Sequence, residues 1–446
     1  MKLYDYSGNG FEIGVEIDNT FTLNGYAADA KATGDALEQA GMYVSEPSSA
    51  DIPELYISGT LPTSKSDGNV IVGVTYISKT GRFSEYATLK VQGDSSTGYP
   101  KKNFTIKFYQ DAQCTIKSKH NFKNWGNENK YVIKANWIDI TQSRNVVTAR
   151  LWTDIVRSRA DYNSLPAAMI ESPKLATIDG FPIKVYANGV YQGRYTFNIP
   201  KDAWMYNMDD ESESDVVLCA DSWNGGRFIT YPALVDETDW TDEIHEDSVP
   251  QSVITKLNNL IYFVQNSTDA QFLANISNYI DVQSFIDFYI FVQVSAAEDN
   301  CGKNLILMSY NNSPYIAGAY DLDSTWGLYW DGTQILGVDI DLSSPSGKMG
   351  LNRLYSRIVS LYSSQIKTRY AELRNNALSA ANIIHRFEEF CNIMPRELIE
   401  EDYASTTAGG AYVNIPSKNL TSLQQIRNFV AERLSVVDSQ IASLGS

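Results

Sequence analysis

The segment AAEDNCGKNLILMSYNNSPYIAGAYDLDSTWG, residues 296–327, carries the strongest structural signal of the chain. It opens with a polar loop in which Asp299 and Asn304 stand five residues apart. The apolar run LILMSY and the run YIAGAYDLD predict two strands, joined by the turn residues NNSP. Before the loop, apolar side chains in residues 282–294 recur at steps of three and four, which predicts a helix. The predicted order is therefore helix, loop, strand, turn, strand and carboxylate.

Two carboxylates, Asp321 and Asp323, end the second predicted strand. Residues two apart on a strand point to one face, and two carboxylates in a mostly apolar segment repel unless a cation lies between them. With Asp299 and Asn304 they form the minimum set for phosphoryl transfer, in which one carboxylate takes the proton of the attacking hydroxyl and the others hold Mg²⁺. Asp and Asn are also typical of turns, so the spacing alone leaves both interpretations open.

Composition excludes several classes of function. The chain has 446 residues, with 53 acidic against 36 basic side chains and a net charge of −17, which disfavours nucleic acid or an anionic membrane as the main partner. No apolar run approaches the ~20 residues of a membrane span, and the amino terminus shows no secretory signal. The three histidines are too scattered to bind zinc. The four cysteines lack a C-x-x-C pair, so we expect them to be reduced.

The pattern of elements predicts an α+β protein with two lobes. Residues 1–50 are predicted to be a separate adaptor or linker segment, and residues 51–200 a β-rich amino-terminal lobe. Asn188-Gly189 is expected to form the turn of a hairpin. Residues 201–446 are predicted to form a mainly helical carboxy-terminal lobe, in which the acidic, aromatic residues 201–250 are an insertion or lid.

A second candidate for chemistry is VQGDSSTGYPKKNFTIKF, residues 91–108. Small residues between two glycines form a loop whose backbone N–H groups are able to approach phosphates. Lys102 and Lys107 are five apart and face opposite sides of a regular strand, so only one is expected to point at a nucleotide. A plain hairpin turn with solvated lysines is the alternative. The candidate nucleotide-binding residues here are Gly93, Ser95, Ser96, Lys102 and Lys107.

Two further charged residues stand just before a predicted helix that begins near Gln142. Asp139 is a candidate acidic partner for the phosphate lysine, and equally a candidate cap for that helix. Arg144 is able to act as a fork donor to phosphate or carboxylate.

Four segments together resemble the CotH family of spore-coat-protein-H-type atypical protein kinases. They are QGDSSTGYPKKNFTIKF, KYVIKANWIDITQSRN, VYANGVYQGRYTFNI and EDNCGKNLILMSY with IAGAYDLDSTWG. The resemblance implies a two-lobed kinase-like fold, ATP with Mg²⁺ or Mn²⁺, and phosphorylation of Ser or Thr on a protein. Asp299 would be the catalytic base, and Asn304 and Asp321, with Asp323 beside it, the metal ligands. Lys102 or Lys107 would hold the phosphates, with Asp139 and Arg144 in support.

Some positions depart from that pattern. No H-R-D precedes the loop, where Ala297 and Glu298 stand instead, and Ala319-Tyr320 replaces P-W before Asp321. In addition, NTFTLNGYAADAKATGDAL, residues 19–37, resembles a segment of phage tail or baseplate proteins. The alternative function is therefore a catalytically inactive, kinase-like attachment module of a phage or cell surface. For an active kinase, the acidic chain suits a basic, Ser-rich protein substrate, such as a spore-coat, surface or virion protein.

Overall fold

The computed structural model describes residues 2–4, 10–12, 52–236, 238–245, 248–332, 335–395, 398–399 and 422–445. Near the amino terminus, β1 (Lys2–Tyr4) pairs antiparallel with β2 (Gly10–Glu12). The rest of the predicted adaptor, including residues 19–37, lies outside the described residues.

Seven strands close into a barrel in the order β3-β4-β5-β6-β7-β9-β8. Neighbours are antiparallel, except that β3 pairs parallel with β8. Apolar side chains from alternate positions of the strands fill the barrel interior. In β6, for example, Phe104, Ile106 and Phe108 are buried and the residues between them are more exposed. The strands are β3 (Glu54–Ser58), β4 (Val70–Ser78), β5 (Gly81–Gln92), β6 (Asn103–Tyr109), β7 (Lys130–Lys134), β8 (Gly180–Ala187) and β9 (Val190–Asn198).

The sequence predicted a β-rich lobe in this region but not the closure of the barrel. Closure depends on the pairing of β3 with β8, which lie more than a hundred residues apart, and no local pattern encodes it. The predicted hairpin is confirmed: Asn188 and Gly189 join β8 to β9 with φ values of +49° and +80°. Two consecutive left-handed residues are what the tightest hairpin turns require.

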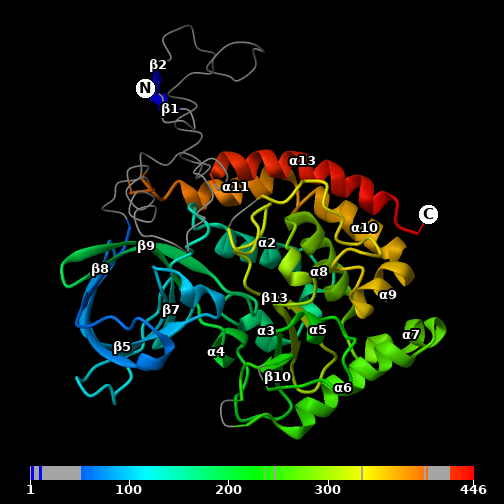
Figure 1. Cartoon of the computed structure of the whole chain (residues 1–446), viewed down its shortest axis with the longest axis horizontal. Coiled ribbons are helices and arrows are strands. Elements are labelled where there is room, and N and C mark those ends of the chain that lie inside the picture. The colour runs from blue at the N-terminus through cyan, green and yellow to red at the C-terminus, as the bar shows by residue number, and fades with distance from the viewer. Residues whose placement is uncertain are drawn as a thin grey trace.

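One long helix, α2 (Arg144–Arg157), lies between β7 and β8 in the chain and packs mainly against α8 (Val282–Ser295) and α11 (Ala380–Cys391). Its Trp152 ring contacts Phe288 and Phe291, with ring centroids 5.9 and 5.4 Å away. Figure 1 shows the barrel at one side, most of the helices at the other, and α2 near the centre beneath α11 and α13.

The second half of the chain combines helices with a four-stranded antiparallel sheet, ordered β11-β10-β12-β13. Its strands are β10 (Val216–Ala220), β11 (Trp240–Asp242), β12 (Leu305–Ser309) and β13 (Ile316–Ala319). The further helices are α3 (Ala167–Glu171), α4 (Ala203–Tyr206), α5 (Trp223–Gly226), α6 (Gln251–Asn266), α7 (Asp269–Asn275), α9 (Arg353–Leu361), α10 (Ser363–Arg374) and α13 (Leu423–Ala442).

The predicted α+β class is confirmed, and the expectation of a lid at residues 201–250 is wrong. That region supplies β10, an inner strand whose five residues are all buried. The strand was not predicted because its apolar run VVLCA is short and the residues around it are mostly acidic or aromatic. Among the described residues, no helix is both long and apolar enough to cross a membrane.

Candidate functional site

The loop after α8 holds Asp299 and Asn304 in fixed positions. The helix stops where Ala296 takes a left-handed conformation with φ +51°, and a short 3₁₀ turn, η6 (Glu298–Cys301), follows. The amide Nδ2 of Asn304 donates to Oδ2 of Asp299 at 3.2 Å, and its backbone N–H donates to Ala220 of β10 at 2.8 Å. Burial raises the pKa of the Asp299 carboxyl, and the charge of Asp321 adds to the rise.

The second part of the site follows β13. That strand ends at Ala319, and Asp321 has a left-handed φ of +53°. The expectation that Asp321 and Asp323 share one face of a strand is therefore wrong, because the chain turns between the strand and the carboxylates. Oδ1 of Asp321 is buried without a hydrogen-bond partner. Its nearest opposite charge is the ammonium of Lys134, 3.6 Å away.

The carboxylates are close enough to change each other's ionisation. Burial raises the pKa of Asp323, and the charges of Asp321 and Asp299 raise it further, while Lys134 opposes the rise. Burial disfavours the charged form of Lys134, yet Asp321 raises the pKa of that lysine above its ordinary value. Asp321 and Asp323 therefore lie close to Lys134 at the end of β7, and Asp299 of the other loop is close enough to act on both carboxylates.

Helix α2 anchors the loop that carries the two carboxylates. Oδ1 of Asn145 accepts the backbone N–H of Leu322 at 3.1 Å. The indole N–H of Trp326 donates to Thr148 at 2.8 Å. The position of the carboxylates therefore depends on how α2 packs against the second half of the chain.

Asp139 and Arg144 form a fully buried ion pair at 2.6 Å. Oδ2 of Asp139 also accepts the backbone N–H of Arg144 at 2.9 Å, which satisfies a free donor at the start of α2. The guanidinium of Arg144 donates to the carbonyl of Thr325 at 3.0 Å and to Gln425 of α13. These contacts give the pair a structural role at the helix start, beside the carboxylate loop.

The glycine loop lies near the same carboxylates. Burial raises the pKa of Tyr99 to about 12, and the charge of Asp323 contributes to that rise. Gly93 has φ +107°, and a Cβ there would lie 2.0 Å from Oγ of Ser96, so only glycine fits. Ser95 and Ser96 lie in a 3₁₀ turn, η3 (Ser95–Gly98), and Ser96 accepts from Nδ2 of Asn103 at 3.2 Å.

The two lysines expected to bind phosphate occupy different places. Lys102 precedes β6 and donates to the carbonyls of Thr97 and Tyr99, both at 2.6 Å, so it braces the glycine loop from within. Lys107 lies within β6, alternating with the buried Ile106 and Phe108. The lysine beside Asp321 is Lys134, which the sequence reasoning missed. Its signal was the basic residue that ends the apolar strand KYVIK.

The protein side chains at this site supply only part of the ligand set that a divalent cation needs. In the described part of the chain, no group of three or more His, Cys, Asp or Glu side chains is arranged to hold a metal. The unpartnered Oδ1 of Asp321 and the amide of Asn304 are nevertheless oxygen donors of the kind that Mg²⁺ accepts. Mg²⁺ is commonly bound by one or two carboxylates plus substrate phosphates and water, which matches this donor set.

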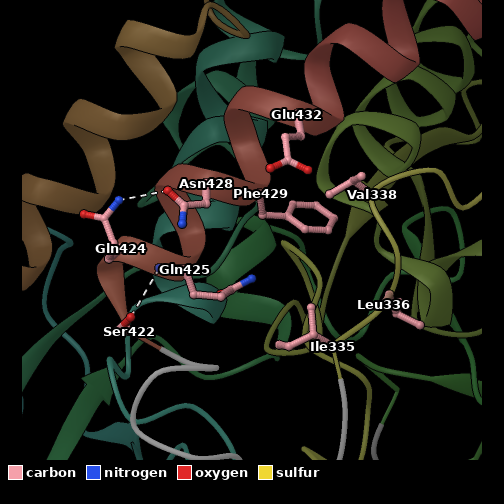
Figure 2. Close-up of a pocket in the computed structure, with 9 residues that line it drawn as sticks. All are labelled: Ile335, Leu336, Val338, Ser422, Gln424, Gln425, Asn428, Phe429 and Glu432. Atoms are coloured by element: carbon pink, nitrogen blue, oxygen red, sulfur yellow. Dashed lines mark hydrogen bonds between the residues drawn. The ribbon is translucent and has the colours of Figure 1, made fainter.

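A pocket of about 430 Å³ lies behind the carboxylate loop. Figure 2 shows α13 on one side of it and residues 335–338 on the other. Gln425 lines the pocket and donates to the carbonyl of Trp326 at 3.0 Å, so it links α13 to the carboxylate loop. Asp299, Asn304 and Asp321 do not line this pocket, which is therefore a neighbour of the site.

Comparison with known proteins gives one family. No curated protein matches the chain. A model of the family described as CotH kinase protein matches residues 89–437, which include the glycine loop, Lys134 and all three carboxylates. Because the match spans well over half of the 446 residues, the chain belongs to the CotH kinase protein family.

Proposed function

We propose that this protein is a protein kinase that transfers the γ-phosphate of ATP to a Ser or Thr hydroxyl, with Mg²⁺ or Mn²⁺ beside the nucleotide. The observation that carries the proposal is the pairing of Lys134 with Asp321 next to the hydrogen-bonded pair Asp299 and Asn304. Phosphoryl transfer needs a lysine on the phosphates, a metal-binding carboxylate, an amide ligand and a base, and Lys134, Asp321, Asn304 and Asp299 have the side-chain types that these roles require. The barrel and the helical half would act as the two lobes of a kinase-like fold.

Each residue has a distinct role in this proposal. Asp299 accepts the proton of the attacking hydroxyl, and its raised pKa strengthens it as a base. Asn304 and Asp321, with Asp323, would hold the cation, which neutralises charge on the phosphates. Lys134 binds phosphate oxygens, and the backbone N–H groups of the glycine loop line the phosphate path. Positioning and charge stabilisation then supply most of the rate.

The substrate that suits this proposal is a basic, Ser-rich protein, such as a spore-coat, surface or virion protein. The net charge of −17 supports this choice, because an acidic surface attracts basic segments. Peptide arrays that showed a preference for acidic residues around the phosphorylated serine would contradict it.

The test is transfer of labelled phosphate from Mg²⁺- or Mn²⁺-ATP to a Ser/Arg-rich peptide and to the protein itself. Wild type should transfer, and Asp299→Ala and Asp321→Ala should not, whereas the exposed Asp210→Ala should match wild type. A wild type that binds nucleotide without transfer would favour the inactive kinase-like attachment module. Binding is measured by thermal shift, since ATP at 100 times its Kd stabilises by about 2.7 kcal/mol.

A further inference from the structure

A second cavity, of about 670 Å³, lies at one end of the barrel. Its walls come from the β4–β5 turn, residues 120–124, the start of β8 and Ile393. Phe83 lines it near the start of β5, whereas the glycine loop begins at Gly93, after that strand ends. At about 3.3 Å per residue, the two are roughly 33 Å apart along the chain. The cavity is therefore separate from the carboxylate site.

Among the described residues, the wall of this cavity carries cations and no carboxylate. Lys79, Arg82, Lys123 and His120 are among the sixteen described residues that line it, and none of these sixteen is Asp or Glu. In a chain with 53 acidic and 36 basic residues, this is a local reversal of charge. Glu85 lies behind His120, which it holds at 3.0 Å.

Two of these cations lack a carboxylate partner. Within the described residues, the guanidinium of Arg82 has no ion pair, and the ammonium of Lys123 contacts only the Phe181 ring, 5.3 Å from its centroid. Both side chains are exposed at the cavity mouth. An anion entering the cavity therefore meets the charges of Arg82 and Lys123, which no carboxylate of the described residues neutralises.

Aromatic rings form the remaining wall. Phe83 stacks on His120 with ring centroids 4.0 Å apart, and Phe122 contacts both Phe83 and Phe181 at 6.4 and 6.3 Å. Small-molecule sites are typically 300–1,000 Å³ and mostly apolar, with a few polar groups that fix orientation. The size and lining of this cavity fit that description.

We propose that this cavity binds a small organic anion, with a phosphate or carboxylate group paired to Arg82 and Lys123 and an apolar or aromatic body against Phe83 and Phe122. The site is independent of the proposed kinase reaction, because none of its residues belongs to the carboxylate cluster.

The test titrates the full chain with phenyl phosphate, phenylacetate and neutral phenol, followed by saturation-transfer NMR at low salt. At least one of the two anions should bind ten times more tightly than phenol. If only phenyl phosphate binds, the ligand class is organic phosphates; if only phenylacetate binds, it is organic carboxylates. Binding of both would show that the cavity recognises the negative charge that the two probes share. Failure of both anions to bind better than phenol would overturn the proposal.

Variants locate the binding. Arg82→Glu combined with Lys123→Glu should weaken anion binding at least tenfold, since it replaces both attractive charges with repulsive ones. Lys90→Glu, an exposed lysine on the same strand as Arg82, is the matched control and should change binding less than twofold. Circular dichroism verifies the fold of each variant, and Arg82→Gln with Lys123→Gln repeats the test without charge reversal. Equal weakening by the control, or no weakening by either double variant, would show that the anion binds elsewhere.

Discussion

Replacing Lys134 by methionine tests the proposed site most directly. The variant keeps most of the side-chain volume and removes the ammonium that lies 3.6 Å from Asp321. At that distance, two unit charges interact by about 4–5 kcal/mol with an effective dielectric constant near 20. Because the Asp321 side chain is 38% exposed, solvent screening reduces this interaction. A phosphate oxygen at a similar distance from Lys134 would gain a comparable attraction. We therefore expect the variant to lose about 2–3 kcal/mol of transition-state stabilisation, which corresponds to a 30- to 150-fold fall in kcat/KM.

The assay is initial-rate phosphate transfer at several ATP concentrations, so that kcat and KM are separated. Lys107→Met and Lys102→Met serve as comparisons. Lys107→Met should stay within threefold of wild type, and Lys102→Met should act through the glycine loop that it braces, raising KM for ATP. A Lys134→Met variant that folds normally and keeps its rate within threefold would refute the assignment. A large loss in Lys107→Met would instead favour Lys107, one of the two lysines predicted from the sequence.

Three other outcomes are expected. Transfer should fall as the pH decreases through the pKa of Asp299, which burial raises above the ordinary aspartate range, because the base must be deprotonated; a pH–rate profile without an acidic limb would contradict this. Arg144→Met should lower the free energy of unfolding by about 3–5 kcal/mol in urea titrations, since it leaves Asp139 buried and unpaired, and a loss below 1 kcal/mol would count against the pair as an anchor. Gly93→Ala should raise KM for ATP, because its Cβ would collide with Ser96 and shift the loop, whereas Gly81→Ala, with open space around it, should not.

Local sequence patterns determined most of the secondary structure. Alternating apolar residues predicted the β-rich lobe, Asn188-Gly189 predicted the hairpin, and the spacing of apolar side chains predicted α8. These elements follow from local rules, because each is stabilised by side chains near it in the chain. The motif around Asp299 and Asn304 was also local, and the structure brings it to the carboxylates by the antiparallel pairing of β12 with β13.

Tertiary structure decided which charged residues meet. Lys134 reaches Asp321 across 187 positions of sequence, and no spacing rule links a lysine at the end of β7 to a carboxylate after β13. Arg144 became a buried anchor because Asp139, Thr325 and Gln425 converge on it. Burial and charge pairing depend on contacts between distant segments, so the sequence alone named Lys102 and Lys107 as candidates, and only the folded chain identified Lys134 as the lysine beside Asp321.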